Sequence, residues 1–218
     1  MAQLVESAAA SIIDVYINCP FDAEYLDFLD ASCFTLQICG FRPRCALEVV
    51  DSSTARIHRI SKIIEECHVG IHDISRYETE GSGLPRFNMP FELGMYLGAK
   101  TFGGQSHSNK SCLVMDSDKH RYRTVLSDIS GQDIESHSGQ IAALIVCVRN
   151  YLSGFRTSIL PGDLEILTRY NEFRTAFPDL CQSFGLTVDN VHFRDRLNII
   201  YYWLRNQQLR ESKSRNTE

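Results

Sequence analysis

The stretch Val69-Gly70-Ile71-His72-Asp73-Ile74-Ser75, followed by the segment that begins at Asn88, decides the fold. Residues 69–74 form a short apolar run that ends beside polar residues, which is the pattern of a buried strand entering a loop. Residues 75–87 are polar, and residues 88–99 return to the spacing of a helix. A strand, a long loop and a helix in this order predict one unit of a parallel α/β sheet.

The same alternation continues on both sides of this unit. We expect strands at 12–19, 44–50, 111–116 and 133–136, and helices at 23–39, 55–67, 121–129 and 141–155. This pattern predicts an α/β fold in which helices cover both faces of a parallel sheet through right-handed crossovers. In such sheets, ligands bind beyond the carboxyl ends of the strands.

The pattern changes after Pro161-Gly162. Residues 163–182 and 191–209 are both helix-periodic, and no run typical of a strand remains. We therefore expect an α/β domain at 1–158 and a helical appendage at 159–218. The polar residues from 210 onward are expected to fray.

Composition excludes several classes of protein. A hydrophobic fraction of 44% and a charged fraction of 22% are typical of a globular chain and argue against wholesale disorder. The net charge is -5, and no run of Lys or Arg forms a basic stripe, so duplex nucleic acid is not an expected partner. No apolar run reaches the roughly 18 residues that a membrane helix needs, so no membrane partner is expected.

Eight cysteines are scattered singly through apolar stretches, without a CxxC pair or the spacing of a zinc site. We expect them to be reduced and buried, with no metal bound. Reduced cysteines are typical of a cytoplasmic protein. The N-terminal segment also carries an acid where a signal peptide carries basic residues, which favours the same location.

Polar residues follow three of the expected strands. Asn18 lies at the end of the first strand, with Phe21 and Asp22 close behind it. Asp51 follows the second strand, and Asp73 closes the third. Because the carboxyl ends of parallel strands meet at one edge, these residues are candidates for binding a ligand there. The plainer alternative for each is a turn or a cap.

Glu92 is the sharpest candidate. Asn88 has the character of an N-cap and Pro90 suits a first helical turn, which places Glu92 one turn inside the helix. The positive end of a helix favours an ionised carboxylate, so we expect an anion if water reaches it. The alternative is a glutamate that only compensates the helix dipole.

The loop after the third strand is bracketed by Arg76 and Arg86, which could clamp a phosphate between them. Phe21 and Tyr96 are candidates for stacking on a base. Solvated charges and core aromatics are the respective alternatives.

Residues 70–75 and 87–99 together resemble the nucleoside 2-deoxyribosyltransferase-like and bacterial TIR-like nucleotide-binding families. In those families a strand ending in D-[IL]-[ST] leads to the helix motif N-x-x-[FY]-E-L-G-x-[AG], whose Glu is catalytic. The resemblance covers roughly residues 13–117. It implies a flavodoxin-like or TIR-like sheet, with Glu92 as the catalytic residue, Asp73 as the acid after the strand and Asn88 as the opening Asn.

The resemblance also implies a reaction, namely cleavage of the N-glycosidic bond of NAD or a related nucleotide, with NAD as a substrate and no cofactor. Such cleavage passes through an oxocarbenium-like sugar, which one carboxylate can trap or stabilise. A cationic nicotinamide leaves without a general acid. A neutral base needs a proton donor, for which Asp73, Asp116 and His72 are the candidates.

In bacteria, such proteins often serve as toxic effectors in anti-phage defence. The resemblance therefore implies a defence-system partner protein or a homo-oligomer held together by the helical tail. Two alternatives stay open: a non-catalytic module that senses a nucleotide, and a protein-interaction module with a degenerate pocket.

Overall fold

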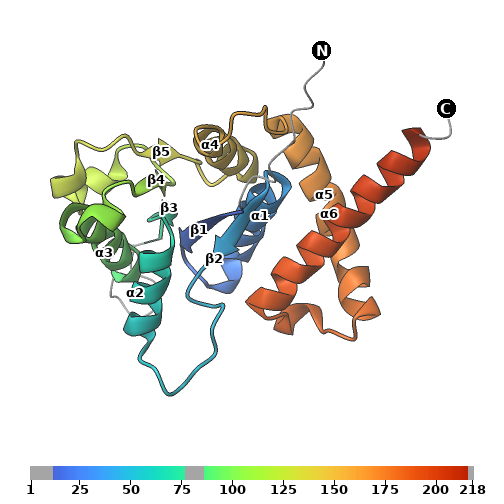
Figure 1. The fold of residues 1–218 in the computed structure, drawn as a ribbon, viewed down its shortest axis with the longest axis horizontal. Coiled ribbons are helices and arrows are strands. Elements are labelled where there is room, and N and C mark those ends of the chain that lie inside the picture. The colour runs from blue at the N-terminus through green and yellow to red at the C-terminus, as the bar shows by residue number, and fades with distance from the viewer. Residues whose placement is uncertain (1–11, 77–85, 216–218) are drawn as a thin grey trace, which may run out of the picture.

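Five parallel strands form the centre of the part of the chain that the computed structural model describes, residues 12–76 and 86–215 (Figure 1). They are β1 (Ile13–Asn18), β2 (Phe41–Arg44), β3 (Val69–Asp73), β4 (Ser111–Asp116) and β5 (Glu135–Ser136). Their order in the sheet is β2-β1-β3-β4-β5. The predicted α/β fold with a parallel sheet is confirmed. In this order, the chain reverses its direction of winding between β1 and β3, which is where such folds bind ligands.

Helices cover both faces of the sheet, as predicted. The α-helices are α1 (Leu26–Ile38), α2 (Arg56–Glu66), α3 (Asn88–Phe102), α4 (Ile141–Ser153), α5 (Asp163–Ser183) and α6 (Phe193–Arg215). The 3-10 helices are η1 (Ala23–Tyr25), η2 (Gln105–His107), η3 (Arg121–Thr124), η4 (Ser127–Ile129) and η5 (Val188–Asn190). The single helix expected at 121–129 is therefore two short 3-10 helices.

Strand β1 shows how the two faces are divided. Val15 and Ile17 pack into the core under α1 and α4, whereas Tyr16 points to the opposite face and packs with residues of α2 and α3. This alternation follows from the two-residue period of a strand. Both faces of the central strands are buried, which explains why the sequence of these strands is almost continuously apolar.

The second strand was predicted in the wrong place. Of the residues expected to form this strand, 44–50, only Arg44 lies in a strand, because the chain turns after β2 through a hydrogen bond from Glu48 N to Cys45 O of 3.1 Å. The observed strand contains Pro43, which argues against a strand in the middle of a sheet. Here β2 is an edge strand that pairs only with β1, and an edge tolerates Pro.

The two helices of the C-terminal region, α5 and α6, lie against α1 (Figure 1). The ring of Phe34 in α1 contacts Phe173 and Trp203, with ring centroids 5.4 Å and 5.8 Å apart. A buried ion pair of 2.5 Å joins Arg196 in α6 to Asp30 in α1. Burial raises the pKa of Asp30 to about 6, although Arg196 acts in the opposite direction. The appendage is thus attached by an apolar contact and a buried charge pair.

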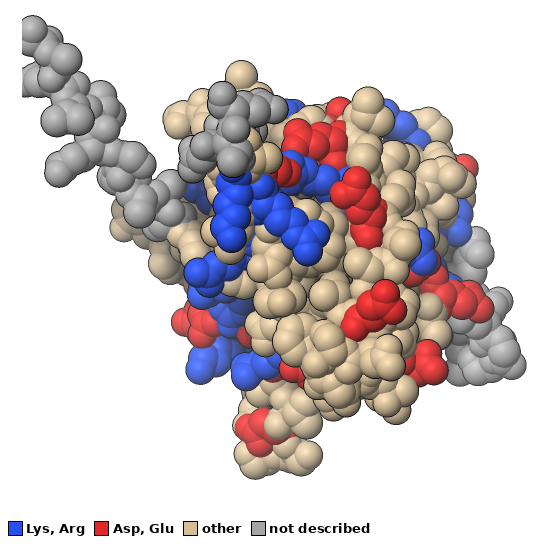
Figure 2. Space-filling view, turned by 90° about the vertical axis from the view of Figure 1, so that its right-hand side faces the viewer, with Lys and Arg blue, Asp and Glu red and all other residues tan. Residues whose placement is uncertain are grey.

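The end of α6 differs from the prediction of fraying from residue 210. The helix continues to Arg215, and Glu211 accepts a 2.6 Å hydrogen bond from Arg169 of α5. This ion pair ties the last turns of α6 to α5. Figure 2 shows the face of the molecule on this side, where Lys and Arg gather mainly along one margin and much of the surface is uncharged.

All eight cysteines are free thiols, and six of them are buried, as expected for small hydrophobic residues of the core. No helix within the described ranges combines the length and the apolar character needed to cross a membrane. Within the same ranges, no three His, Cys, Asp or Glu side chains gather closely enough to hold a metal ion.

Candidate functional site

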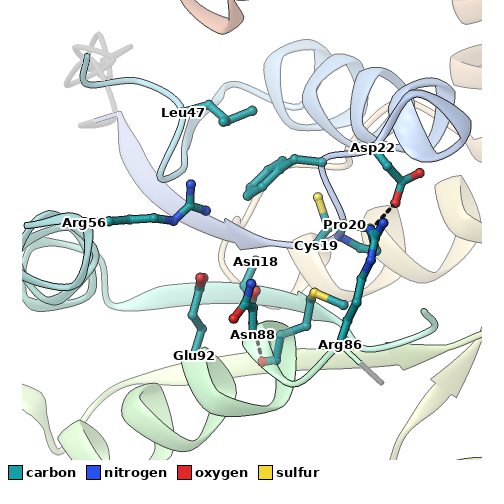
Figure 3. Close-up of a pocket in the computed structure, with 11 residues that line it drawn as sticks. Asn18, Cys19, Pro20, Asp22, Leu47, Arg56, Arg86, Asn88 and Glu92 are labelled. Carbon is teal, nitrogen blue, oxygen red and sulfur yellow. Dashed lines mark hydrogen bonds and ion pairs between the residues drawn. The ribbon is translucent and has the colours of Figure 1, made fainter. Parts of the chain in front are cut away.

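A cavity of about 520 Å³ lies at the carboxyl edge of the sheet, beside the ends of β1 and β3 (Figure 3). The residues that line it are Asn18, Cys19, Pro20, Phe21, Asp22, Leu47, Arg56, Arg86, Asn88, Met89 and Glu92. They come from the end of β1 and the loop after it, the turn after β2, the start of α2, and the segment from Arg86 into the first turns of α3. Six of them were predicted from the sequence: Asn18, Phe21, Asp22, Arg86, Asn88 and Glu92.

Glu92 projects from α3 toward this cavity, opposite Arg56 (Figure 3). Only 4% of Glu92 is exposed, and its Oε2 accepts a hydrogen bond from the hydroxyl of Tyr16. Burial raises the pKa of Glu92 above its ordinary value, while the bond from Tyr16 and the charge of Arg56 act in the opposite direction. The sequence-based expectation considered only the helix end, which favours an ionised Glu92. The structure adds burial, which is the largest influence on this pKa and favours the neutral form.

The start of α3 also differs in detail from the prediction. Asn88 is the first residue of the helix and not its N-cap, which is Phe87 and makes no capping hydrogen bond through its side chain. The side chain of Asn88 lines the cavity instead. Pro90 lies in the first turn, as expected, where its missing N–H costs no helical hydrogen bond.

Asn18 joins the end of β1 to the start of α3. Its amide Nδ2 donates to Met89 O at 2.8 Å and lies 3.0 Å from Nδ1 of His72. This Nδ1 accepts, so the proton of the imidazole sits on Nε2. Burial lowers the pKa of His72 to about 3, which keeps the ring neutral. Asn18 therefore positions the helix that carries Glu92.

Asp22 is held by two cations. Arg76 donates to its Oδ1 at 2.9 Å. Arg86 donates to its Oδ2 at 2.7 Å (Figure 3). Arg76 also pairs with Glu24 at 2.8 Å and does not line the cavity. The predicted phosphate clamp of Arg76 and Arg86 thus converges on a carboxylate of the protein. Residues 77–85 of the loop between them lie outside the described residues.

Asp73, predicted to be catalytic, does not line the cavity. Its carboxylate accepts from the hydroxyl of Tyr25 at 2.5 Å and from Ser75 N at 2.9 Å, and it lies 3.0 Å from Nε2 of His137. Burial opposes its ionisation, but His137, Ser75 and Tyr25 together hold the pKa of Asp73 below its ordinary value. The carboxylate serves to join β3 to the segments before α1 and α4.

Tyr96 and Asp51 also lie away from this cavity. Tyr96 projects from α3 and is fully buried, stacked on Tyr16 with ring centroids 6.4 Å apart, and its hydroxyl donates to Ser111 O at 3.0 Å. It is a core residue and cannot stack on a ligand. Asp51 accepts from Ser53 N at 2.8 Å and lines a neighbouring cavity.

The alternative proton donors are not placed for acid catalysis in this cavity. His72 is fully buried against the ring of Tyr96. Asp116 is fully buried and pairs with Arg121 at 2.6 Å. Among the described lining residues, Asp22 is the only carboxylate besides Glu92, and it is paired with two arginines.

Sequence reasoning missed Arg56, Tyr16 and Leu47. Arg56 had a detectable signal, because it opens the helix that follows the second strand and so lies at the ligand edge. Tyr16 lies within an apolar strand, where nothing local marks it as a partner of Glu92. Leu47 was assigned to a strand and is in the turn after β2.

No protein-family model matches this chain, and a search of curated protein sequences finds no match.

Proposed function

We propose that this chain cleaves the N-glycosidic bond of a nucleotide, with NAD or a related nucleotide as the substrate and Glu92 as the catalytic carboxylate. The observation that carries the proposal is the position of Glu92. Its carboxylate borders a cavity at the point where the sheet reverses its winding, in surroundings that raise its pKa. Perturbed carboxylates in such cavities are typical of catalytic sites.

In the proposed reaction, the bond between the ribose C1′ and the ring nitrogen of the nicotinamide breaks. The electron pair of that bond goes to the nitrogen and neutralises the pyridinium. The ionised carboxylate of Glu92 faces the positive charge that develops on the sugar and stabilises it, or bonds to C1′ as a transient ester. Water then supplies the oxygen that ends on C1′, and its proton passes to the solvent.

The surroundings of Glu92 favour a leaving group that is already cationic. A neutral purine or pyrimidine needs a proton on its nitrogen as it leaves. The three other candidate donors, Asp73, Asp116 and His72, are buried away from the cavity. A nicotinamide attached through a positively charged nitrogen leaves as a neutral molecule and needs no donor.

The test is incubation of the purified full chain with NAD, followed by chromatographic measurement of released nicotinamide, alongside a panel of nucleosides and nucleotides. Glu92→Gln is expected to abolish the release. Glu172→Gln is the matched control, because Glu172 is exposed on α5 and far along the chain from the cavity. If none of the compounds is cleaved by the parent chain, the proposal fails.

A second candidate is a module that binds a nucleotide without cleaving it. The observation that favours it is the low exposure of Glu92, 4%, combined with the hydrogen bond from Tyr16. A buried carboxylate fixed by a hydrogen bond is also consistent with a pocket that binds a nucleotide without cleaving it. Nucleotide-dependent thermal stabilisation without turnover would support this candidate over the enzyme.

A further inference from the structure

A second cavity, of about 480 Å³, adjoins the Glu92 cavity. The two share Leu47 and Arg56 among their lining residues. The turn after β2 and the loop before α2 form one side of the second cavity, and residues 191–193, at the start of α6, form the other. The α/β sheet and the helical appendage therefore both contribute to it. Each cavity alone falls within the roughly 300–1,000 Å³ of ordinary small-molecule sites.

The loop wall of the second cavity is fixed by its own hydrogen bonds. Asp51 accepts from the backbone and the hydroxyl of Ser53, at 2.8 Å and 2.6 Å, and from Thr54 Oγ1 at 2.9 Å. Arg59 of α2 donates to the carbonyl oxygens of Asp51 and Thr54. A wall that is already ordered loses little conformational entropy when a ligand binds.

Arg56 stands at the junction of the two cavities. It is the first residue of α2, and its guanidinium reaches toward the space between Leu47 and Glu92 (Figure 3). Within the described residues it forms no hydrogen bond and no ion pair, and its guanidinium lies 5.9 Å from the centre of the Phe21 ring. The carboxylate of Glu92 lies across the first cavity and interacts with Arg56 only through its charge, not through an ion pair. A guanidinium that is not engaged in an ion pair between two cavities suits a phosphate group that spans them.

The chemistry of the second cavity complements that of a nucleotide. Apolar side chains such as Val49 and Val50 offer a surface for a planar base, and His192 and Phe193 contribute two rings on the opposite side. Ser52 adds a hydroxyl at the same rim. Mixed apolar and hydrogen-bonding linings of this kind are typical of sites for small organic ligands.

We infer that the two cavities form one two-lobed site for a substrate whose two nucleoside halves are joined by phosphate groups. The Glu92 lobe takes the half whose glycosidic bond breaks, Arg56 binds the bridging phosphates, and the lobe closed by residues 191–193 takes the other half. The cleavage half of this inference rests on the proposed function. Binding of a nucleoside diphosphate in the second lobe does not.

The first experiment measures the binding of ADP to the full chain by titration calorimetry, since ADP is one half of NAD and lacks the nicotinamide, the leaving group of the proposed reaction. His192→Glu places a negative charge in the second lobe and is expected to weaken ADP binding by at least about tenfold, or 1.4 kcal/mol. His192 is exposed and directly precedes α6, where an acid is favourable, so the fold is expected to survive. Gln208→Glu adds the same charge on the exposed surface of α6 and should leave the affinity unchanged.

The second experiment compares cleavage of NAD with cleavage of nicotinamide mononucleotide, which lacks the second nucleoside. His192→Glu is expected to raise the KM for NAD about tenfold, with little change in kcat. The KM for nicotinamide mononucleotide should stay the same. A split of this kind requires that the second half of NAD lies near His192.

The outcomes separate the two claims. If ADP does not bind, or if His192→Glu changes neither ADP affinity nor the KM for NAD, the two-lobed site is wrong even when NAD is cleaved. If ADP binds and His192→Glu weakens it while no nucleotide is cleaved, the second lobe stands and the proposed N-glycosidase function fails.

Discussion

Glu92 and Asp73 are two carboxylates at the same edge of the sheet, both expected from the sequence to be catalytic, and the structure places them in opposite environments. Each is nearly inaccessible, at 4% and 1% exposure. Glu92 has one hydrogen-bond donor and borders a cavity, and its pKa is raised. Asp73 lies among three polar partners, and its pKa is lowered. Burial alone thus does not assign a role to either one.

The difference comes from the two-residue period of β3. Ile71 packs under α1 and α4, and Asp73, two residues later, faces the same side and meets Tyr25 and His137. His72 points to the other face, where it meets Tyr16 and Tyr96. Glu92 is on α3, which covers that other face. The two carboxylates are therefore on opposite sides of the sheet, and a single cavity cannot hold both as catalysts.

The largest expected effect is that of Glu92→Gln on turnover. If Glu92 stabilises the developing cation, its loss lowers kcat for NAD by at least about a thousandfold, as the loss of a group that stabilises transition-state charge does. The free energy of unfolding at neutral pH is expected to stay the same or rise, because a neutral amide replaces a carboxylate whose ionisation burial opposes. Chemical denaturation measures the second quantity. A Glu92→Gln variant that unfolds more easily and still cleaves NAD would show that Glu92 has a structural role and not a catalytic one.

Asp73→Asn is expected to act on stability instead. An amide has only one acceptor oxygen, so it cannot accept from both Tyr25 and Ser75 as the carboxylate does. We expect a loss of about 3 kcal/mol in the free energy of unfolding, the scale on which breaking a buried charged network acts. Turnover per folded molecule should remain within about tenfold of the parent, since Asp73 does not border the cavity. If Asp73→Asn abolishes turnover and leaves the free energy of unfolding unchanged, Asp73 is a catalytic residue and not a structural one.

The sheet and most of its helices could be predicted from the sequence because the spacing of apolar residues follows from which face of each helix or strand is buried. β4 was predicted with its observed bounds, Ser111–Asp116. β2 was missed because Phe41–Arg44 is an edge strand held partly by charge: Arg42 and Arg44 both donate to Asp14. A polar edge strand with an internal Pro lacks the periodic apolar signal on which the prediction depends.

The site could be predicted only as far as topology determines it. Asn18 and Glu92 follow from strand ends and the start of a helix, and the cavity contains both. The contact between Tyr16 and Glu92 joins residues 76 positions apart, and no local pattern encodes it. Whether Arg76 faces a ligand or Asp22 likewise depends on side-chain pairing, which spacing along the chain does not reveal.

His72→Gln is expected to change how stability depends on pH. The pKa of His72 is lowered to about 3 by burial, so the unfolded chain binds this proton more readily than the folded chain. The contribution of His72 to stability is therefore full above its ordinary pKa of 6.5 and is lost progressively as pH falls toward 3. His72→Gln keeps an acceptor for Asn18 but cannot titrate. Between pH 7 and pH 5, the parent should lose about 2 kcal/mol more than the variant. Parallel pH profiles in urea unfolding would show that His72 is not the titrating group.

The smallest effect is expected from Tyr16→Phe, which tests why the pKa of Glu92 lies where it does. Burial raises this pKa and the hydroxyl of Tyr16 lowers it, so removing the hydroxyl should raise it further. If ionised Glu92 is required, activity falls as pH drops through this pKa, and the acid limb of kcat/KM should move to higher pH in the variant. Because Tyr16 transfers no proton in this scheme, the loss at the high-pH plateau should stay below the roughly hundredfold that follows removal of an acid–base catalyst. Tyr96→Phe is the matched control, since that hydroxyl donates to Ser111 O and not to Glu92. An acid limb that stays in place in Tyr16→Phe, or that moves equally in Tyr96→Phe, would mean that the limb does not report the ionisation of Glu92.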